Sequence, residues 1–173
     1  MSFAEALHFV LQQEGGYVSN PAEPGGATNH GITQQTYDAY RVARGLPSQP
    51  VSAITEAEVR DIYRTGYWSA CRCDDIEHQA GAPLALVVFD TAVNSGVSRA
   101  ATMLQELLGV PTDGAVGPIT LAALAGRDYS RLVEDYLWRR LAFDASIPRN
   151  RPAALQFLPG WVHRILLLRS HGR

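Results

Sequence analysis

Two carboxylates and a hydroxyl near the start of the chain have the types and spacing for acid/base chemistry. Glu14 follows an apolar helical stripe, and Glu23 and Thr28 lie in the loop after it. A carboxylic acid in an apolar setting loses solvation of its charged form, so its pKa is expected to rise and it can donate a proton near neutral pH. Glycoside hydrolysis commonly uses a second carboxylate as nucleophile or as base. We therefore expect glycosidic bond cleavage with Glu14 as acid, Glu23 as the second carboxylate, and Thr28 helping to hold a water.

The segment before Glu14 predicts the helix that positions it. Steps of 4, 3 and 4 residues lead from Phe3 through Leu7 and Val10 to Glu14, which places the carboxylate on the apolar face of the last turn. The residues alone leave a second interpretation open, in which Glu14 caps a helix end and Glu23 is solvated.

The segment from 17 to 32 predicts turns and a short hairpin that face Glu14, because it contains three glycines and two prolines. Glycine permits unusual backbone angles and lets a backbone approach a sugar closely, so Gly25, Gly26 and Gly31 are candidates for such an approach, with a plain tight turn as the alternative. Tyr17, Tyr67 and Trp68 have rings that suit stacking on a sugar, but aromatic residues at helix ends are more often core.

The rest of the chain predicts a mainly α fold with a small β-hairpin beside the first helix. Between residues 84 and 96 the sequence is apolar almost all round, as in a buried central helix. Asp90 in this helix needs a partner, either an arginine or a helix N-terminus, and a buried anchor is favoured over a substrate contact. Asn94 is either a substrate contact or a C-cap. A loop is expected at 71–83, and further helices at 33–44, 55–65, 98–108, 118–125, 129–146 and 160–170. The helix at 55–65 is expected to open with a capping box of Thr55 and Glu58.

Composition limits the classes of function. The chain has 173 residues, 46% of them hydrophobic, with a net charge of -2 and a pI near 6.2, which suits a compact soluble monomer and gives no case for a nucleic-acid partner. We expect residues 1–89 and 90–173 to be two regions packed into one globule. No run is long enough to span a bilayer, and the start lacks the features of a secretion signal. The protein is therefore expected to be made in the cytoplasm and released by another route.

Two further segments carry groups that suggest other chemistry. Cys71 and Cys73 are too close for an ordinary disulfide and lack zinc-site spacing, so two reduced thiols are favoured over a metal site, and no cofactor is expected. The helix expected at 161–169 mixes Arg164 and Arg169 with a leucine-rich run. That mixture is compatible with membrane contact, but packing in the core is favoured.

A long motif adds a family resemblance. Residues 14–33 read EGGYVSNPAEPGGATNHGIT, which closely resembles the glycoside hydrolase family 108 pattern E-G-G-Y-V-x-x-P-x-D-P-G-G-x-T-x-x-G-I-T. Tyr67-Trp68, Cys73-Asp74 and VFDTAVNSG at 88–96 continue the match. LLGVPTDGAVGPITLAAL at 107–124 resembles the family's C-terminal part, often called a predicted peptidoglycan domain.

The resemblance implies a lysozyme-like N-acetylmuramidase that cleaves the β-1,4 bond between N-acetylmuramic acid and N-acetylglucosamine. Glu14 matches the family's essential acid, and Glu14, Glu23 and Thr28 together look like the catalytic triad of phage-type lysozymes. Position 23 is Glu where the family usually has Asp, and the extra methylene moves the carboxylate by roughly an ångström, a scale that matters in catalysis.

Three alternatives stay open at this stage. The enzyme can be a lytic transglycosylase, in which one acid/base suffices, or the chain can be a peptidoglycan-binding protein without activity. The biological setting is either a phage endolysin freed by a holin or a bacterial wall-remodelling enzyme that assists secretion or release.

Overall fold

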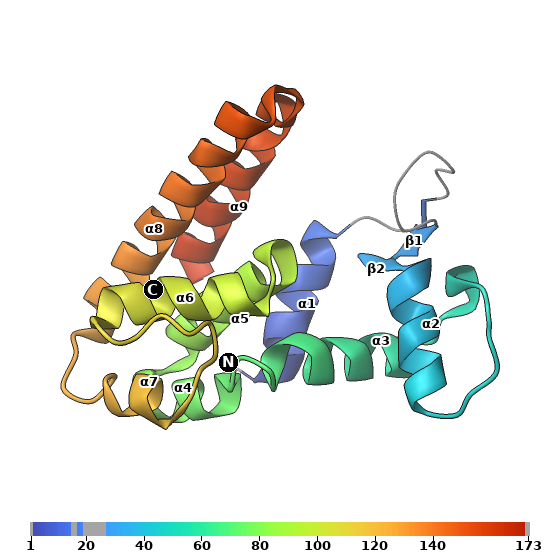
Figure 1. Cartoon of the computed structure of the whole chain (residues 1–173), viewed down its shortest axis with the longest axis horizontal. Helices are drawn as coiled ribbons and strands as arrows, with labels where there is room; N and C mark the ends of the chain where they lie inside the picture. Colours follow the sequence, from blue (N-terminus) through green and yellow to red (C-terminus); the bar gives the residue numbers. More distant parts are fainter. Residues whose placement is uncertain (1, 15–16, 19–26, 172–173) are drawn as a thin grey trace. The chain divides into compact units, whose positions relative to one another are not determined.

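A computed structural model of the chain describes residues 2–14, 17–18 and 27–171. The described chain forms two compact units, Phe3–Gly66 and the part from Tyr67 onward (Figure 1). Both units are built mainly from helices, as the sequence predicts. The boundary expected between residues 89 and 90 falls inside one continuous helix of the second unit.

The first unit places a small hairpin between its first and second helices. Its elements are α1 (Phe3–Gln13), β1 (Thr28–Asn29), β2 (Ile32–Thr33), α2 (Gln34–Ala43), the 3-10 helix η1 (Val51–Ala53) and α3 (Glu56–Tyr63). The π-helix η2 (Arg64–Trp68) continues from α3 across the boundary between the units.

The apolar stripe of α1 is buried as its spacing predicts. Phe3, Leu7 and Val10 are all at most 7% exposed. The guanidinium groups of Arg60 and Arg64 lie 5.7 and 5.0 Å from the centre of the Phe3 ring, which joins the start of α1 to α3 and to the first residue of η2. The backbone that carries Glu14 is thus held from the far end of its helix.

Polar caps fix where α2 and α3 begin. The Thr33 hydroxyl accepts the backbone N–H of Thr36. At α3, the Glu58 N–H donates to the Thr55 hydroxyl, and the Thr55 N–H donates to the Glu58 carboxylate. This reciprocal capping box satisfies two N–H groups that a helix start leaves without partners, and it confirms the sequence prediction at 55–58.

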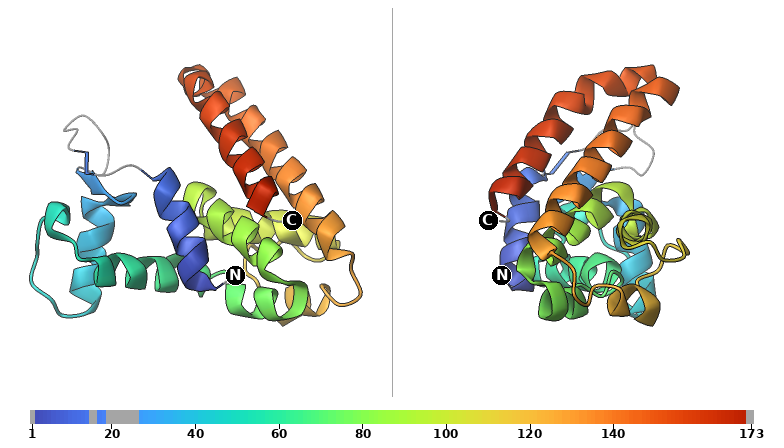
Figure 2. Two further views of the ribbon diagram at one scale, coloured as in Figure 1. Left: turned by 180° about the vertical axis from the view of Figure 1, so that it is seen from behind. Right: turned by 90° about the vertical axis from the view of Figure 1, so that its left-hand side faces the viewer.

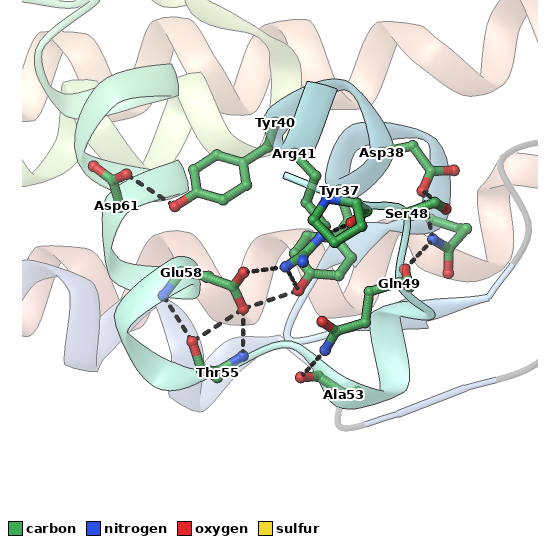
Figure 3. Close-up of polar contacts among 12 residues, drawn as sticks. Tyr37, Asp38, Tyr40, Arg41, Ser48, Gln49, Ala53, Thr55, Glu58 and Asp61 are labelled. Atoms are coloured by element: carbon green, nitrogen blue, oxygen red, sulfur yellow. Dashed lines mark hydrogen bonds and ion pairs between the residues drawn. The ribbon is translucent and has the colours of Figure 1, made fainter. Parts of the chain in front are cut away.

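A buried network then ties α2 to α3, as Figure 3 shows. The Arg41 Nη1 atom donates to Glu58 Oε1 at 2.6 Å and to the Tyr37 hydroxyl at 2.9 Å, and that hydroxyl donates to Glu58 Oε2 at 2.9 Å. Burial opposes the charged form of Glu58, but hydrogen bonds from Thr55 and Tyr37 and the charge of Arg41 outweigh it and lower the pKa of this carboxyl. The pKa of Tyr37 is raised, mainly because its hydroxyl is buried and also because that hydroxyl donates a hydrogen bond to Glu58.

The second unit is a cluster of helices followed by a long helical hairpin. Its elements are α4 (Cys73–Ala80), α5 (Ala82–Ser95), α6 (Val97–Leu108), α7 (Pro118–Ala122), α8 (Tyr129–Asn150), the 3-10 helix η3 (Pro152–Phe157) and α9 (Leu158–His171). Figure 2 shows α8 and α9 running side by side. The prediction of a loop at 71–83 is wrong over most of its length, because helix α4 occupies it. Asp74 and Asp75 favour a helix start there, and Ile76 and Ala80 bury one face of the helix.

Helix α5 is the centre of this unit. Every residue from Leu84 to Ala92 is buried, and the helix packs against α4, α6 and α8. An apolar sequence without a polar face therefore predicted a central helix correctly.

Asp90 has the arginine partners that its burial requires. Arg140 Nη1 of α8 lies 2.5 Å from Asp90 Oδ2, and Arg164 Nη2 of α9 lies 2.8 Å from Oδ1. Asp144 lies 3.6 Å from Arg140 and is 4% exposed, and burial raises its pKa despite that neighbouring charge. The prediction of an arginine partner for Asp90 is confirmed, and the cluster joins α5, α8 and α9.

The two cysteines of the chain lie in the second unit. Cys71 and Cys73 are both buried and free thiols. In the described part of the chain, no group of three His, Cys, Asp or Glu residues could hold a metal ion. No helix there is long and apolar enough to cross a bilayer.

Candidate active site

Glu14 lies one residue beyond the end of α1. Its backbone N–H donates to the carbonyl of Val10 at 3.1 Å, so the peptide still completes the last helical turn. Its side chain is partly buried. The position agrees with the periodicity argument, since the carboxylate follows the buried stripe of α1.

A tight turn lies against the Glu14 carboxylate. β1 and β2 pair antiparallel, with Thr28 opposite Thr33 and Asn29 opposite Ile32. The two residues between them, His30 and Gly31, have φ of 50° and 73°, as a type I′ hairpin turn requires. The Asn29 side chain donates to the Val51 carbonyl at 3.2 Å, which anchors the hairpin to η1.

Gly31 leaves no room for a side chain. A Cβ atom there would lie 2.9 Å from Glu14 Oε2, 3.1 Å from Glu14 Cγ and 2.7 Å from the Tyr63 hydroxyl oxygen. These distances are shorter than ordinary van der Waals contacts. The backbone of the turn therefore packs directly on the carboxylate and limits where it can lie.

Tyr63 also holds that turn. It is the last residue of α3 and is 1% exposed, and its hydroxyl donates to the His30 carbonyl at 2.8 Å. A buried tyrosine usually has a partner for its hydroxyl, but nothing in the sequence around Tyr63 indicates that this partner is the turn beside Glu14. Sequence reasoning missed Tyr63 for this reason.

Thr28 lies in the hairpin whose turn contacts Glu14. Its backbone exchanges two hydrogen bonds of 2.8 Å with Val18, which fixes residues 17 and 18 beside the hairpin. Tyr17 is 53% exposed, so its ring is accessible to a sugar. The roles expected of Thr28 and Tyr17 remain predictions.

The second carboxylate lies outside the described residues, as do two of the expected glycine contacts. Glu23, Gly25 and Gly26 all lie between residues 19 and 26, which the structure does not describe. Their expected roles therefore rest on the sequence alone.

The remaining expected contacts lie in the second unit. Trp68 is 1% exposed, its indole N–H donates to Asp74 at 2.9 Å, and its ring packs edge-on against Phe89 at 5.3 Å. The expected sugar stacking on Trp68 is therefore wrong, because both the ring and its polar atom are used inside the unit. Tyr67 is partly buried. The exposed Asn94 donates to the Asp90 carbonyl at 2.9 Å, while the C-cap of α5 is Gly96.

A half-open pocket of about 470 Å³ lies beside the turn. It is lined by Leu7, His8 and Leu11 of α1, by His30, and by residues of α3 that include Arg60. His30 thus has two contacts here: its carbonyl accepts the hydrogen bond from Tyr63, and the residue lines the pocket. Sequence reasoning did not single out this pocket.

Comparisons with known proteins fit this geometry. Residues 7–96 match the family model described as glycosyl hydrolase 108, and residues 99–166 match one described as a predicted peptidoglycan domain. A solved structure titled as Brucella abortus SagA is 35% identical, with a TM-score of 0.80, over 98% of this chain and 92% of that one. The helical, lysozyme-like fold class is thereby confirmed. No curated protein shows significant similarity.

Proposed function

Because the chain belongs to the glycosyl hydrolase 108 family, and is therefore a glycoside hydrolase that acts on peptidoglycan, we propose that it is an N-acetylmuramidase. Its substrate bond is the β-1,4 bond between N-acetylmuramic acid and N-acetylglucosamine. The observation that carries this proposal is the Glu14 carboxylate held against the backbone of the Gly31 turn.

In the proposed reaction Glu14 is the general acid. It donates its proton to the glycosidic oxygen as the bond to the anomeric carbon breaks, and positive charge develops on the sugar ring. A general acid must lie within hydrogen-bond reach of that oxygen. The Gly31 turn supports this role because it restricts the carboxylate without placing a side chain in front of it.

The second half of the reaction needs a water and a base. We assign the base or positioning role to Glu23, with the Thr28 hydroxyl helping to hold the water. The hydrogen bonds between Thr28 and Val18 support this assignment, because they fix the strand that precedes the turn. The spacing of the two carboxyl groups decides between retention and inversion at the anomeric carbon.

The experiment is hydrolysis of purified peptidoglycan by Glu14→Gln. Removing a general acid costs about 10²- to 10⁴-fold in rate, so the variant should release almost no fragments. Glu5→Gln is the matched control, since Glu5 is an exposed residue in the first turn of the same helix. Unchanged release by Glu14→Gln would refute the assignment.

Mass spectrometry of the products tests the type of reaction. New reducing ends indicate hydrolysis, whereas 1,6-anhydro ends indicate lytic transglycosylation, in which the sugar's own hydroxyl attacks. Glu23→Ala gives a second answer from the same assay. If that variant keeps full activity, the mechanism with two carboxylates is wrong.

We propose a phage endolysin as the biological role, acting as a monomer on the cell wall after release from the cytoplasm. Expression in a bacterium with and without a separately supplied holin tests this role. Lysis only when the holin is present supports it. Lysis of the same cells without a holin would show that the protein reaches the wall by another route.

A further inference from the structure

The end of the α8–α9 hairpin is a folded segment without a core of its own. We call residues 145–163 the hairpin tip; they include the end of α8, all of η3 and the start of α9 (Figures 1 and 2). No residue of the tip is buried, although Asp144 before it and Arg164 after it both are. The core-packing prediction for the last helix is thus confirmed for Arg164, Ile165 and Leu168, but it does not account for the tip.

The tip exposes large apolar side chains. Leu155 is 60% exposed and Phe157 is 55% exposed. The rings of Phe157 and Trp161 lie 6.3 Å apart at an angle of 35°, so they form one aromatic pair. Exposed apolar groups gathered in this way usually mark a contact with a partner or a membrane.

The charge around this apolar surface has one sign. Arg149 and Arg151 are exposed on the tip, and the sequence contains no Asp or Glu after Asp144. Apart from the buried Arg164, whose charge is paired with Asp90, the local surface is therefore cationic. A partner for the tip should be anionic and should also accept apolar side chains.

We propose that the hairpin tip docks on the surface of a bilayer that contains anionic phospholipid. Phe157, Trp161 and Leu155 enter the interfacial region, where aromatic rings are favoured, and Arg149 and Arg151 contact lipid phosphates. This is surface docking, and it agrees with the finding that no helix in the described part of the chain can span a bilayer. The proposal is independent of the hydrolase mechanism, because no tip residue belongs to the Glu14 site.

Charge and chemistry favour this occupant over two others. A second copy would bring two tips together, each with arginines and without carboxylates, so their charges would repel. A glycan strand offers hydroxyl groups and ring faces for the aromatic pair, but it offers the aliphatic Leu155 side chain little apolar surface. A bilayer interface accommodates all of these groups.

Co-sedimentation of the full chain with lipid vesicles tests the proposal. Wild type should bind vesicles of phosphatidylcholine mixed with phosphatidylglycerol. An arginine near an anionic surface is worth about fivefold in binding, so the double variant Arg149→Gln/Arg151→Gln should bind about 30-fold more weakly. Leu155→Ser/Phe157→Ser should lose at least about tenfold through the apolar contacts.

Matched controls separate the tip from general charge and hydrophobicity. Arg131→Gln/Arg139→Gln removes the same charge from α8 outside the tip, and both arginines form surface ion pairs there. Val42→Ser/Ile119→Ser removes apolar side chains that are 77% and 66% exposed elsewhere. Both controls should bind vesicles like wild type, and both tip variants should still hydrolyse purified peptidoglycan.

Three results would overturn the proposal. The first is the absence of wild-type binding to anionic vesicles. The second is equal loss of binding in tip variants and controls. The third is a wild-type dimer, or binding to insoluble peptidoglycan, that the tip variants abolish while vesicle binding stays unchanged.

Discussion

Replacing Gly31 by alanine tests whether the turn positions the Glu14 carboxylate. The new Cβ would lie 2.9 Å from Glu14 Oε2 and 2.7 Å from the Tyr63 hydroxyl. An ordinary contact between carbon and oxygen is about 3.5 Å, so the carboxylate or the turn must shift by roughly half an ångström. A displacement of about 1 Å can cost about 10²-fold in catalysis. We therefore expect kcat to fall about tenfold or more with little change in KM, since the variant displaces the acid without removing a substrate contact.

The same substitution also strains the backbone, so stability needs its own control. Gly31 has φ of +73°, where an L-residue costs about 1–2 kcal/mol. Gly45 has φ of +65°, but a Cβ there would meet no atom within 4 Å. Gly45→Ala should therefore lose a similar free energy of unfolding and keep its activity. Denaturant unfolding and rates of peptidoglycan hydrolysis, measured on both variants, separate the two effects.

Two outcomes would refute this reasoning. A wild-type kcat in Gly31→Ala would mean that the turn does not set the carboxylate position. An equal loss of kcat in Gly45→Ala would mean that backbone strain in this unit, and not the contact with Glu14, limits activity. Circular dichroism of both proteins confirms that the rates come from folded enzyme.

Three further substitutions test the groups that support the site and the second unit. Tyr63→Phe removes the donor to the His30 carbonyl, so we expect a loss of about 0.5–1.5 kcal/mol in stability and a smaller fall in kcat than in Gly31→Ala, both measured as above. The pKa of Glu58 is lowered from its ordinary value of 4.5. The stabilisation that the charged carboxylate provides is therefore complete above pH 4.5 and is lost as the pH falls through the folded-state pKa. The Tm difference between wild type and Glu58→Gln should shrink on acidification below pH 4.5, and a constant difference would contradict this prediction. Asp90→Asn leaves Arg140 and Arg164 buried without their carboxylate, and urea unfolding should show a loss of about 3–5 kcal/mol, against at most about 1 kcal/mol for the exposed pair broken by Asp135→Asn.

Local patterns in the sequence were sufficient where the cause of a structure is itself local. The capping box of Thr55 and Glu58 requires only residues three positions apart, and both of its hydrogen bonds are present. The stripe of α1 and the all-apolar α5 follow in the same way from periodicity and hydrophobicity. These predictions needed no knowledge of which elements meet in space.

The sequence was insufficient to predict which residues far apart in the chain contact each other. Burial of Asp90 could be predicted from its neighbours, and so could its need for an arginine. Nothing in the sequence, however, selects Arg140 and Arg164, which lie 50 and 74 residues further along the chain. The prediction for Trp68 was wrong for a related reason. An aromatic residue with a polar edge suits a sugar and a carboxylate partner equally well, and here Asp74 is the partner.

The candidate site depends on both local patterns and long-range packing. This explains why the acid could be predicted from the sequence, whereas the residues that position it could not. Glu14 is identified by a helical stripe and a motif, both of which are properties of neighbouring residues. The restriction on its carboxylate comes instead from Gly31, and Tyr63 holds the Gly31 turn from 33 residues beyond His30. A glycine with a positive φ is common in hairpins, so only its contact with Glu14 gives it a role in the chemistry. The family motif and the fold therefore explain different parts of one site: the motif identifies the proton donor, and packing determines where that donor lies.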